Sequence, residues 1–136
     1  MKLQKATRCA LFAILELAGD PGRQMSAHEI ADKYGISTNH LAKVLRSLGR
    51  AGLLEAVRGA GGGYRFSGSV KRTTLLDVIQ LFETIDPLAR GEREDGDGTP
   101  GGGALCEVLT EIEDIARATF ASISLETMLK LVDKKR

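Results

Sequence analysis

The chain has 136 residues, 43% of them hydrophobic and 27% charged, with a formal net charge of +1 at pH 7. This length suits one domain with its own core and excludes a large multidomain enzyme. No apolar run is long enough to cross a bilayer, and Glu16 and Asp20 interrupt the apolar positions near the N-terminus. We therefore expect a cytoplasmic protein with neither a secretory leader nor a membrane partner.

The small net charge conceals two halves of opposite sign. Residues 1–74 hold 12 basic and 5 acidic residues, a net of +7, whereas residues 75–136 hold 7 and 13, a net of −6. A basic half separated from an acidic half favours a polyanionic partner such as nucleic acid. The alternative is a solvated surface whose charge is merely uneven.

Two helices and a tight turn are expected at the start of the basic half. The first helix covers residues 3–18, where small and apolar residues recur at helical spacing. The second covers residues 26–34, because Ser26 and Glu29 have the spacing of a capping box. Gly35 suits the turn that follows.

A third helix begins at the N-cap candidate Ser37 and ends near Gly52. Helix, short glycine turn and helix is the pattern of a helix-turn-helix unit. One face of the third helix is apolar, with Leu41, Val44, Leu45 and Leu48. The other face is polar and basic, with Asn39, His40, Lys43, Arg46 and Arg50.

Two short strand-like runs, residues 53–57 and 64–66, follow the third helix. Four of the five residues 59–63 between them are glycine, which allows a hairpin tip with positive φ angles. A hairpin directly after a helix-turn-helix is a wing. The expected fold is therefore mainly α with a small β-hairpin wing.

The acidic half begins with a helix over residues 75–82 that Thr74 caps. Helical periodicity then stops in a stretch rich in glycine and acidic residues, and it returns at residue 104. We expect a winged helix-turn-helix DNA-binding domain over residues 1–83 and a flexible loop over 84–103. Residues 104–136 are expected to form a dimerisation helix and a C-terminal helix.

The longest expected helix, residues 104–122, carries an apolar stripe with alternating spacings of three and four. A small domain cannot cover such a stripe, so it calls for a partner helix and predicts a homodimer. The predicted dimerisation residues are Leu105, Val108, Leu109, Ile112, Ile115, Ala116, Thr119 and Phe120.

Double-stranded DNA is the partner that the basic half suits best. A recognition helix reads base edges in the major groove with its N-terminal residues, so Asn39 can pair with adenine and Lys43 with guanine. Arg46 and Arg50 lie farther along and suit phosphate contacts, while Arg58 in the wing suits a narrow minor groove. The DNA-binding candidates are Ser26, His28, Ser37, Thr38, Asn39, His40, Lys43, Arg46, Arg50, Arg58 and Gly61.

The wing sequence Val-Arg-Gly-Ala-Gly-Gly-Gly-Tyr at residues 57–64 resembles the hallmark of the Rrf2 family of bacterial winged helix-turn-helix regulators. Residues 1–3, 39–45 and 51–53 resemble the family too, and the likeness covers nearly the whole chain. The resemblance implies a sequence-specific transcriptional regulator, expected to be a repressor. It would act as a homodimer on a pseudo-palindromic operator, with the long helix of each subunit packed on the other.

The resemblance also raises the question of a sensor. Many members of the family hold an iron–sulfur cluster on three cysteines. Here Cys106 matches the last of the three, residues 88–103 contain none, and Arg8 stands where some members have a carboxylate.

Three interpretations of the sensor stay open, and no cofactor is predicted firmly. An iron–sulfur cluster could be completed by loop carboxylates such as Glu92, Glu94 or Asp95, or by Cys9 of the partner subunit. Cys106 could instead be a thiol switch near a helix N-terminus, which favours the thiolate. Otherwise the cysteines are inert, and a small molecule or a protein is the effector.

Catalysis is not expected. The glycine run 59–63 leads into a strand, whereas a phosphate-binding loop opens a helix. His28 and His40 have no metal-ligand spacing with either cysteine. The remaining alternative is a protein-interaction regulator that controls a partner enzyme through the long helix.

Overall fold

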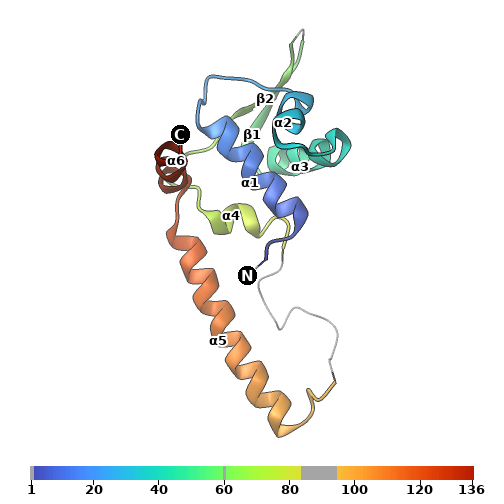
Figure 1. The fold of residues 1–136 in the computed structure, drawn as a ribbon, viewed down its shortest axis with the longest axis vertical. Helices are drawn as coiled ribbons and strands as arrows, with labels where there is room; N and C mark the ends of the chain where they lie inside the picture. The colour runs from blue at the N-terminus through green and yellow to red at the C-terminus, as the bar shows by residue number, and fades with distance from the viewer. Residues whose placement is uncertain (1, 60, 84–94) are drawn as a thin grey trace.

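The computed structural model describes residues 2–59, 61–83 and 95–136. A mostly helical body carries a hairpin at one end, and one long helix extends away from it (Figure 1). The elements are α1 (Lys5–Ala18), α2 (Ala27–Tyr34), α3 (Thr38–Arg50), β1 (Leu54–Val57), β2 (Gly63–Phe66), α4 (Leu75–Ile79), α5 (Pro100–Ser122) and α6 (Leu125–Lys134). The expected fold class, mainly α with a β-hairpin wing, is confirmed. Across these described ranges, no helix is long and apolar enough to cross a membrane.

The start of α5 differs from the expectation. The helix begins at Pro100, not at residue 104, because Thr99 is its N-cap and accepts a hydrogen bond from Gly102 N–H at 3.0 Å. The three glycines at 101–103 disfavour a helix here, since each costs about 1 kcal/mol relative to alanine, yet they lie within the first turn. Most of the expected flexible loop, residues 84–94, lies outside the described residues.

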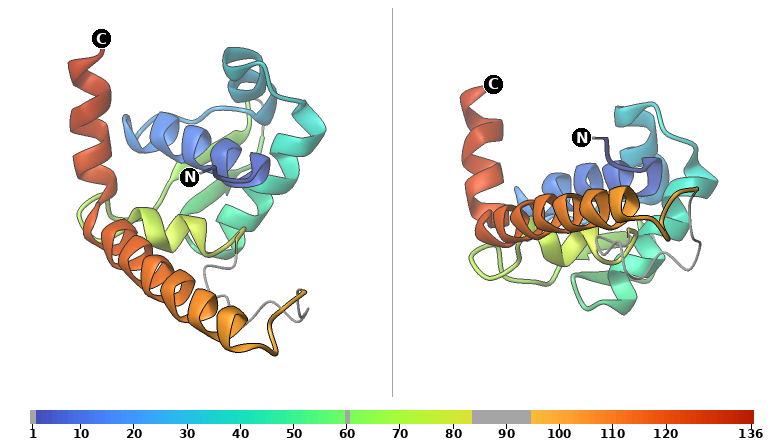
Figure 2. Two further views of the ribbon diagram at one scale, coloured as in Figure 1. Left: turned by 60° about the horizontal axis from the view of Figure 1, so that its bottom comes forward. Right: turned by 90° about the horizontal axis from the view of Figure 1, so that it is seen from below.

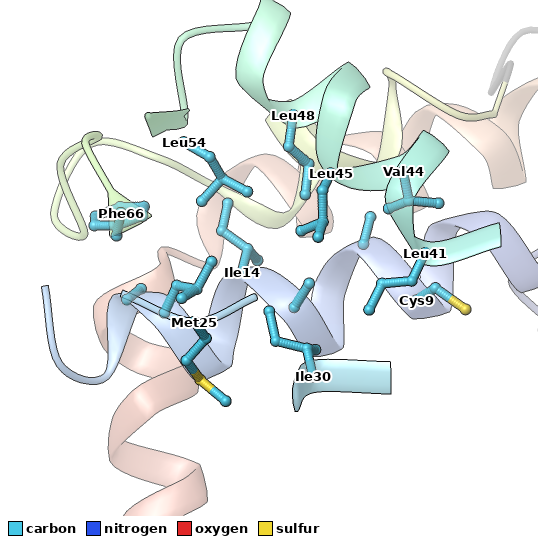
Figure 3. Packing of buried hydrophobic residues seen from close by; sticks show 14 of the residues in the cluster. Cys9, Ile14, Met25, Ile30, Leu41, Val44, Leu45, Leu48, Leu54 and Phe66 are labelled. Carbon is cyan, nitrogen blue, oxygen red and sulfur yellow. The ribbon is translucent and has the colours of Figure 1, made fainter. Parts of the chain in front are cut away.

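The body is built around α1. Seven of the 14 residues of α1 are buried, and side chains from α2, α3 and the hairpin pack against them (Figure 3). Val78 of α4 and Leu125 of α6 belong to the same core. Leu41, Leu45 and Leu48 of α3 are fully buried, as is Ile14 of α1. Burying each such side chain contributes about 1.5–3 kcal/mol, so this packing fixes the orientation of α3 on the body.

The helix-turn-helix follows from local hydrogen bonds. Ser26 Oγ accepts from Glu29 N–H at 3.1 Å, and Glu29 Oε1 accepts from Ser26 N–H at 3.3 Å, which completes the capping box. α2 ends at Gly35 with φ of 65°, a left-handed conformation that glycine adopts at no steric cost. Ser37 Oγ then accepts from His40 N–H at 3.4 Å, and α3 begins.

The wing is a two-stranded antiparallel hairpin, extended on one side by a single residue of the α1–α2 connection. The pairs run from Leu54 with Phe66 to Val57 with Gly63. Met25 donates to Tyr64 O at 2.9 Å and accepts from Tyr64 N–H at 2.8 Å. At Gly63 a Cβ would overlap the Met25 carbonyl oxygen, so this close approach requires glycine.

α6 returns to the body and packs beside α1 (Figures 1 and 2). Leu125 is fully buried in the core. The Leu125 N–H donates to Thr73 O at 2.9 Å, and the Glu126 N–H donates to Val70 O at 3.0 Å. α6 is therefore fastened to the segment that links the wing to α4, whereas α5 extends away from it.

Candidate nucleic-acid interface

The outer face of α3 follows from its inner face. Since its leucines and Val44 point into the core, side chains on the opposite side must face solvent. Asn39, Lys43, Arg46 and Arg50 are all exposed, at successive spacings of four, three and four residues. They form one ridge of hydrogen-bonding and cationic groups, which we call the α3 ridge.

The N-terminal ends of α2 and α3 contribute differently from one another. The Ser26 hydroxyl is engaged in its own capping box, and the residue is half-buried, whereas His28 is exposed. Ser37 and Thr38 are exposed at the start of α3. The first-turn N–H groups of a helix can bind a phosphate, so exposed residues here suit contacts with a nucleic-acid backbone.

His40 is placed less favourably for reading bases. Its side chain is half-buried, and its Nε2 atom is shielded from solvent without a hydrogen-bond partner among the described residues. The ring therefore turns at least one nitrogen toward the protein, while Asn39 and Lys43 beside it are exposed. Its predicted part in DNA binding stays a prediction.

The wing tip presents Arg58 and Gly61 to solvent. It projects from the end of the body opposite to α5 (Figure 1). Gly61 has φ of 75°, a conformation that favours glycine. Across the hairpin, Arg65 pairs with Glu55 at 3.2 Å, so the charge of this arginine is partly neutralised.

Sequence reasoning missed one contact at the wing. Gln24 Nε2 donates to Gly61 O at 2.7 Å and so joins the hairpin tip to the segment before α2. The two residues are 37 positions apart, and no periodicity or motif indicates that they meet. Their contact depends on the packing of the wing against Met25.

α5 carries the predicted dimerisation stripe. Leu105, Val108, Leu109, Ile112 and Ile115 are 43% to 61% exposed, and no residue of α5 is buried. Ala116 and Phe120 are half-buried, and Thr119 donates its hydroxyl to Ile115 O at 2.9 Å within the helix. A stripe of this size facing solvent is typical of an interface.

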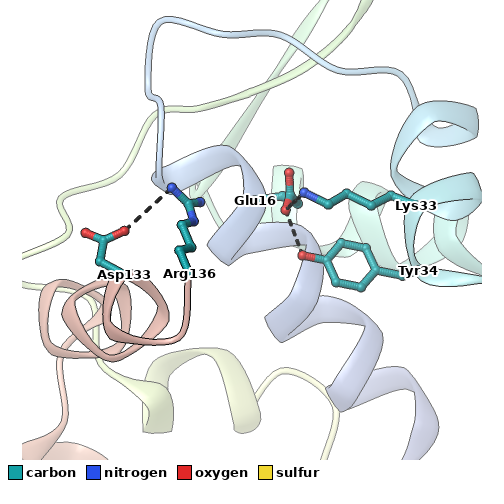
Figure 4. A network of polar contacts seen from close by, with 5 residues as sticks. All are labelled: Glu16, Lys33, Tyr34, Asp133 and Arg136. Carbon is teal, nitrogen blue, oxygen red and sulfur yellow. Dashed lines mark hydrogen bonds and ion pairs between the residues drawn. The ribbon is translucent and has the colours of Figure 1, made fainter.

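A polar contact locks α1 to the last turn of α2. Glu16 accepts from Lys33 Nζ at 2.6 Å and from the Tyr34 hydroxyl at 2.8 Å (Figure 4). Burial alone would raise the pKa of the Glu16 carboxyl, but these two hydrogen bonds together lower it. Burial and the Glu16 carboxylate raise the pKa of the Tyr34 phenol, which therefore stays a donor. The Tyr34 ring also stacks on Phe12 with centroids 5.1 Å apart.

The same residues line a cleft of about 710 Å³ between α1, α2 and α6. Asp133 of α6 and Arg136, just beyond the end of this helix, lie on the other side of the cleft, 3.6 Å apart (Figure 4). The cleft holds charges of both signs, so its lining does not favour a ligand of either charge.

The two cysteines lie in different surroundings. Burial raises the pKa of the Cys9 thiol, an effect that nearby Lys5 and Arg8 reduce, and Cys9 is only 3% exposed. Cys106 is exposed. Because α5 begins at Pro100, Cys106 lies in the second turn, whereas the effect of the helix dipole falls off within the first turn.

The described residues do not fit an iron centre. In residues 2–59, 61–83 and 95–136, no three histidine, cysteine, aspartate or glutamate side chains lie close enough to hold a metal ion. Of the proposed carboxylate ligands, Asp95 is exposed, whereas Glu92 and Glu94 lie outside the described residues. Iron–sulfur clusters are held chiefly by thiolates, and the chain has two cysteines in all.

Comparison with known proteins places this geometry in context. The family model Rrf2, described as an iron-dependent transcriptional regulator, matches residues 3–131. BadM of Rhodopseudomonas palustris, named as an HTH-type transcriptional regulator, is 54% identical over 137 residues, which cover 100% of this chain and 86% of BadM.

Two solved structures share the architecture. CymR, the global cysteine regulator of B. subtilis, is 28% identical with a TM-score of 0.77, and the match covers 96% of this chain and 98% of CymR. IscR of T. potens is 26% identical with a TM-score of 0.73, and the match covers 100% of this chain and 91% of IscR.

Proposed function

The chain belongs to the Rrf2 family of transcriptional regulators, and we propose that it represses transcription as a homodimer bound to a specific pseudo-palindromic operator. The α3 ridge carries this proposal, because it puts an amide and three cations on one exposed face of a rigidly packed helix. The protein acts by binding DNA in the cytoplasm and not by catalysis.

Within each half-site, α3 lies in the major groove. Asn39 and Lys43, in the first half of the helix, contact base edges, as such side chains do with adenine and guanine. Arg46 and Arg50 contact phosphate, which fixes the register of the helix on the duplex without reading sequence. Arg58 reaches the minor groove from the wing, where a narrow groove concentrates negative potential.

The second half-site requires a second chain. α5 has 23 residues, so it is about 34 Å long, and nothing in its own described chain buries its apolar stripe. Two such stripes packed together would bury each other and give a dimer with two α3 ridges related by a two-fold axis. The operator then has half-sites spaced by about 10 bp or a multiple of it.

Selection of duplexes from a random pool, followed by fluorescence anisotropy, tests the recognition. Lys43→Ala should cost about 1–3 kcal/mol and relax the base preference at one position in each half-site. Arg46→Ala should weaken binding to all DNA sequences alike, and it should reduce the slope of log affinity against log salt concentration by about one. Lys130→Ala is the matched control, because it removes an exposed cation from α6.

Unchanged operator affinity after Lys43→Ala and Arg58→Ala together would show that the recognition residues are misassigned. That outcome would favour the alternative, a regulator that controls a partner enzyme through α5, since such a protein has no use for these two cations.

A redox signal is a further part of the proposal, and Cys106 is its candidate because this thiol is exposed and flanks the α5 stripe. Oxidation next to the dimer seam would alter the relation of the two α3 ridges. Cys106→Ser should abolish any effect of peroxide or nitric oxide on operator affinity, and Cys9→Ser should leave it in place. If both variants respond as the parent does, neither thiol senses, and a small molecule or protein is the effector.

A further inference from the structure

We propose that Gln24 is a positioning residue for the wing, whose side-chain amide holds the glycine tip so that Arg58 meets DNA in one fixed geometry. The proposal rests on the proposed function, because it concerns the same operator contact. It adds a residue that lies outside both the recognition helix and the hairpin.

The contact itself is well formed. Gln24 Nε2 lies 2.7 Å from the carbonyl oxygen of Gly61, within the range of a good hydrogen bond. Both residues are exposed, so the bond adds little to the stability of the core. Its main effect is therefore on the conformation of the hairpin tip.

The tip needs such a restraint. Beyond the last strand pair, Val57 with Gly63, the chain is rich in glycine, which loses more conformational freedom on ordering than any other residue. A turn bond from Gly62 N–H to Gly59 O, at 2.9 Å, shapes the tip from within but joins it to nothing outside. The Gln24 bond joins it to the body.

Gln24 is itself held in place by its neighbour. Met25 exchanges two backbone hydrogen bonds with Tyr64 of β2, and its side chain is 3% exposed in the core. The backbone at residue 24 is thus fixed beside the tip end of β2, where Gly63 permits close approach. From there the long amide side chain reaches the tip.

The physical result is preorganisation. Arg58 lies three residues before the anchored carbonyl of Gly61, so a tip held in one conformation restricts where the guanidinium can go. The entropy cost of ordering the tip is then met in the free protein, so it no longer opposes the binding of DNA. Gln24 should therefore raise operator affinity only when Arg58 is present, because its effect acts through the position of that guanidinium.

A double-mutant cycle on the full-length protein tests this. Gln24→Met keeps the length of the side chain but removes the donor, and it should weaken operator binding about three- to tenfold. In the Arg58→Ala background the same change should have an effect of less than about twofold, because coupled residues are not additive. Thermal melting of the free protein should not change.

Gln80→Met is the matched control, because it makes the same chemical change at an exposed glutamine that ends α4. It should leave operator affinity unaltered in both backgrounds.

Two results would overturn the proposal. One is no loss of affinity on Gln24→Met, and the other is an equal loss with and without Arg58, which would mean that Gln24 acts independently of the wing arginine. Failure of the proposed function is distinguishable, since Lys43→Ala and Arg58→Ala would then have no effect of their own.

Discussion

α1 and α5 are both helices with an apolar stripe, but the stripe is buried in α1 and exposed in α5. Half of the 14 residues of α1 are buried by other elements of the same chain, whereas none of the 23 residues of α5 is buried. A stripe predicts that a helix needs cover, but it does not say whether its own chain provides it. In α1 the cover is intramolecular, and in α5 we propose that it is a second subunit.

The largest effect should come from a charge in the α5 stripe. Ile112→Asp would place an unpaired carboxylate in the dimer seam, so operator affinity should fall by about 100-fold or more as the dimer dissociates. The body should keep its fold, because Ile112 is 54% exposed in the single chain. Sedimentation and anisotropy measure the two results.

Ala118→Asp is the control for that change, since it adds the same charge to an exposed position of α5 off the stripe. A monomeric Ile112→Asp protein that still binds the full operator normally would contradict the role of α5.

The second prediction compares the same truncation in the two regions, in the monomeric Ile112→Asp background. Leu45→Ala removes a fully buried side chain and should lower the free energy of unfolding by about 2–5 kcal/mol. Leu109→Ala removes one that is 43% exposed and should cost less than about 1 kcal/mol. Urea denaturation measures both, and equal losses would mean that α5 is packed within its own chain.

A smaller effect concerns the contact that ties α1 to the helix-turn-helix. The pKa of Glu16 is lowered in the folded protein, so its contribution to stability is present above the unfolded pKa and lost as pH falls through the folded one. Between about pH 6 and about pH 3, the melting temperature of the parent should fall more than that of Glu16→Gln. Parallel pH profiles would show that the carboxylate contributes nothing through its charge.

Much of the fold could be predicted because its signals are local. The capping box at Ser26, the turn at Gly35 and the cap at Ser37 are each set by residues no more than four positions apart, and the structure has each of them. The sequence predicts the start of α5 at residue 104, because the glycines before it disfavour a helix. The helix in fact begins at Pro100, and Thr99 followed by Pro100 is itself a helix-start pattern.

The features that could not be predicted depend on tertiary packing. Nothing near Leu125 in the sequence shows that α6 fills the core beside α1, or that Gln24 reaches the wing tip. For α3, periodicity correctly indicated which face is buried, and therefore which side chains face outward. It could not show that an Nε2 atom of His40 would be shielded, because that depends on neighbours outside the helix.

In the proposed complex, two α3 ridges joined through α5 read one operator. Hydroxyl-radical footprinting of the selected operator, with the stoichiometry measured on the same complex, tests it most directly. We expect two chains per duplex and two equivalent protected stretches, with centres about 10 bp or a multiple of it apart. One chain bound to a single protected stretch at saturation would contradict the account.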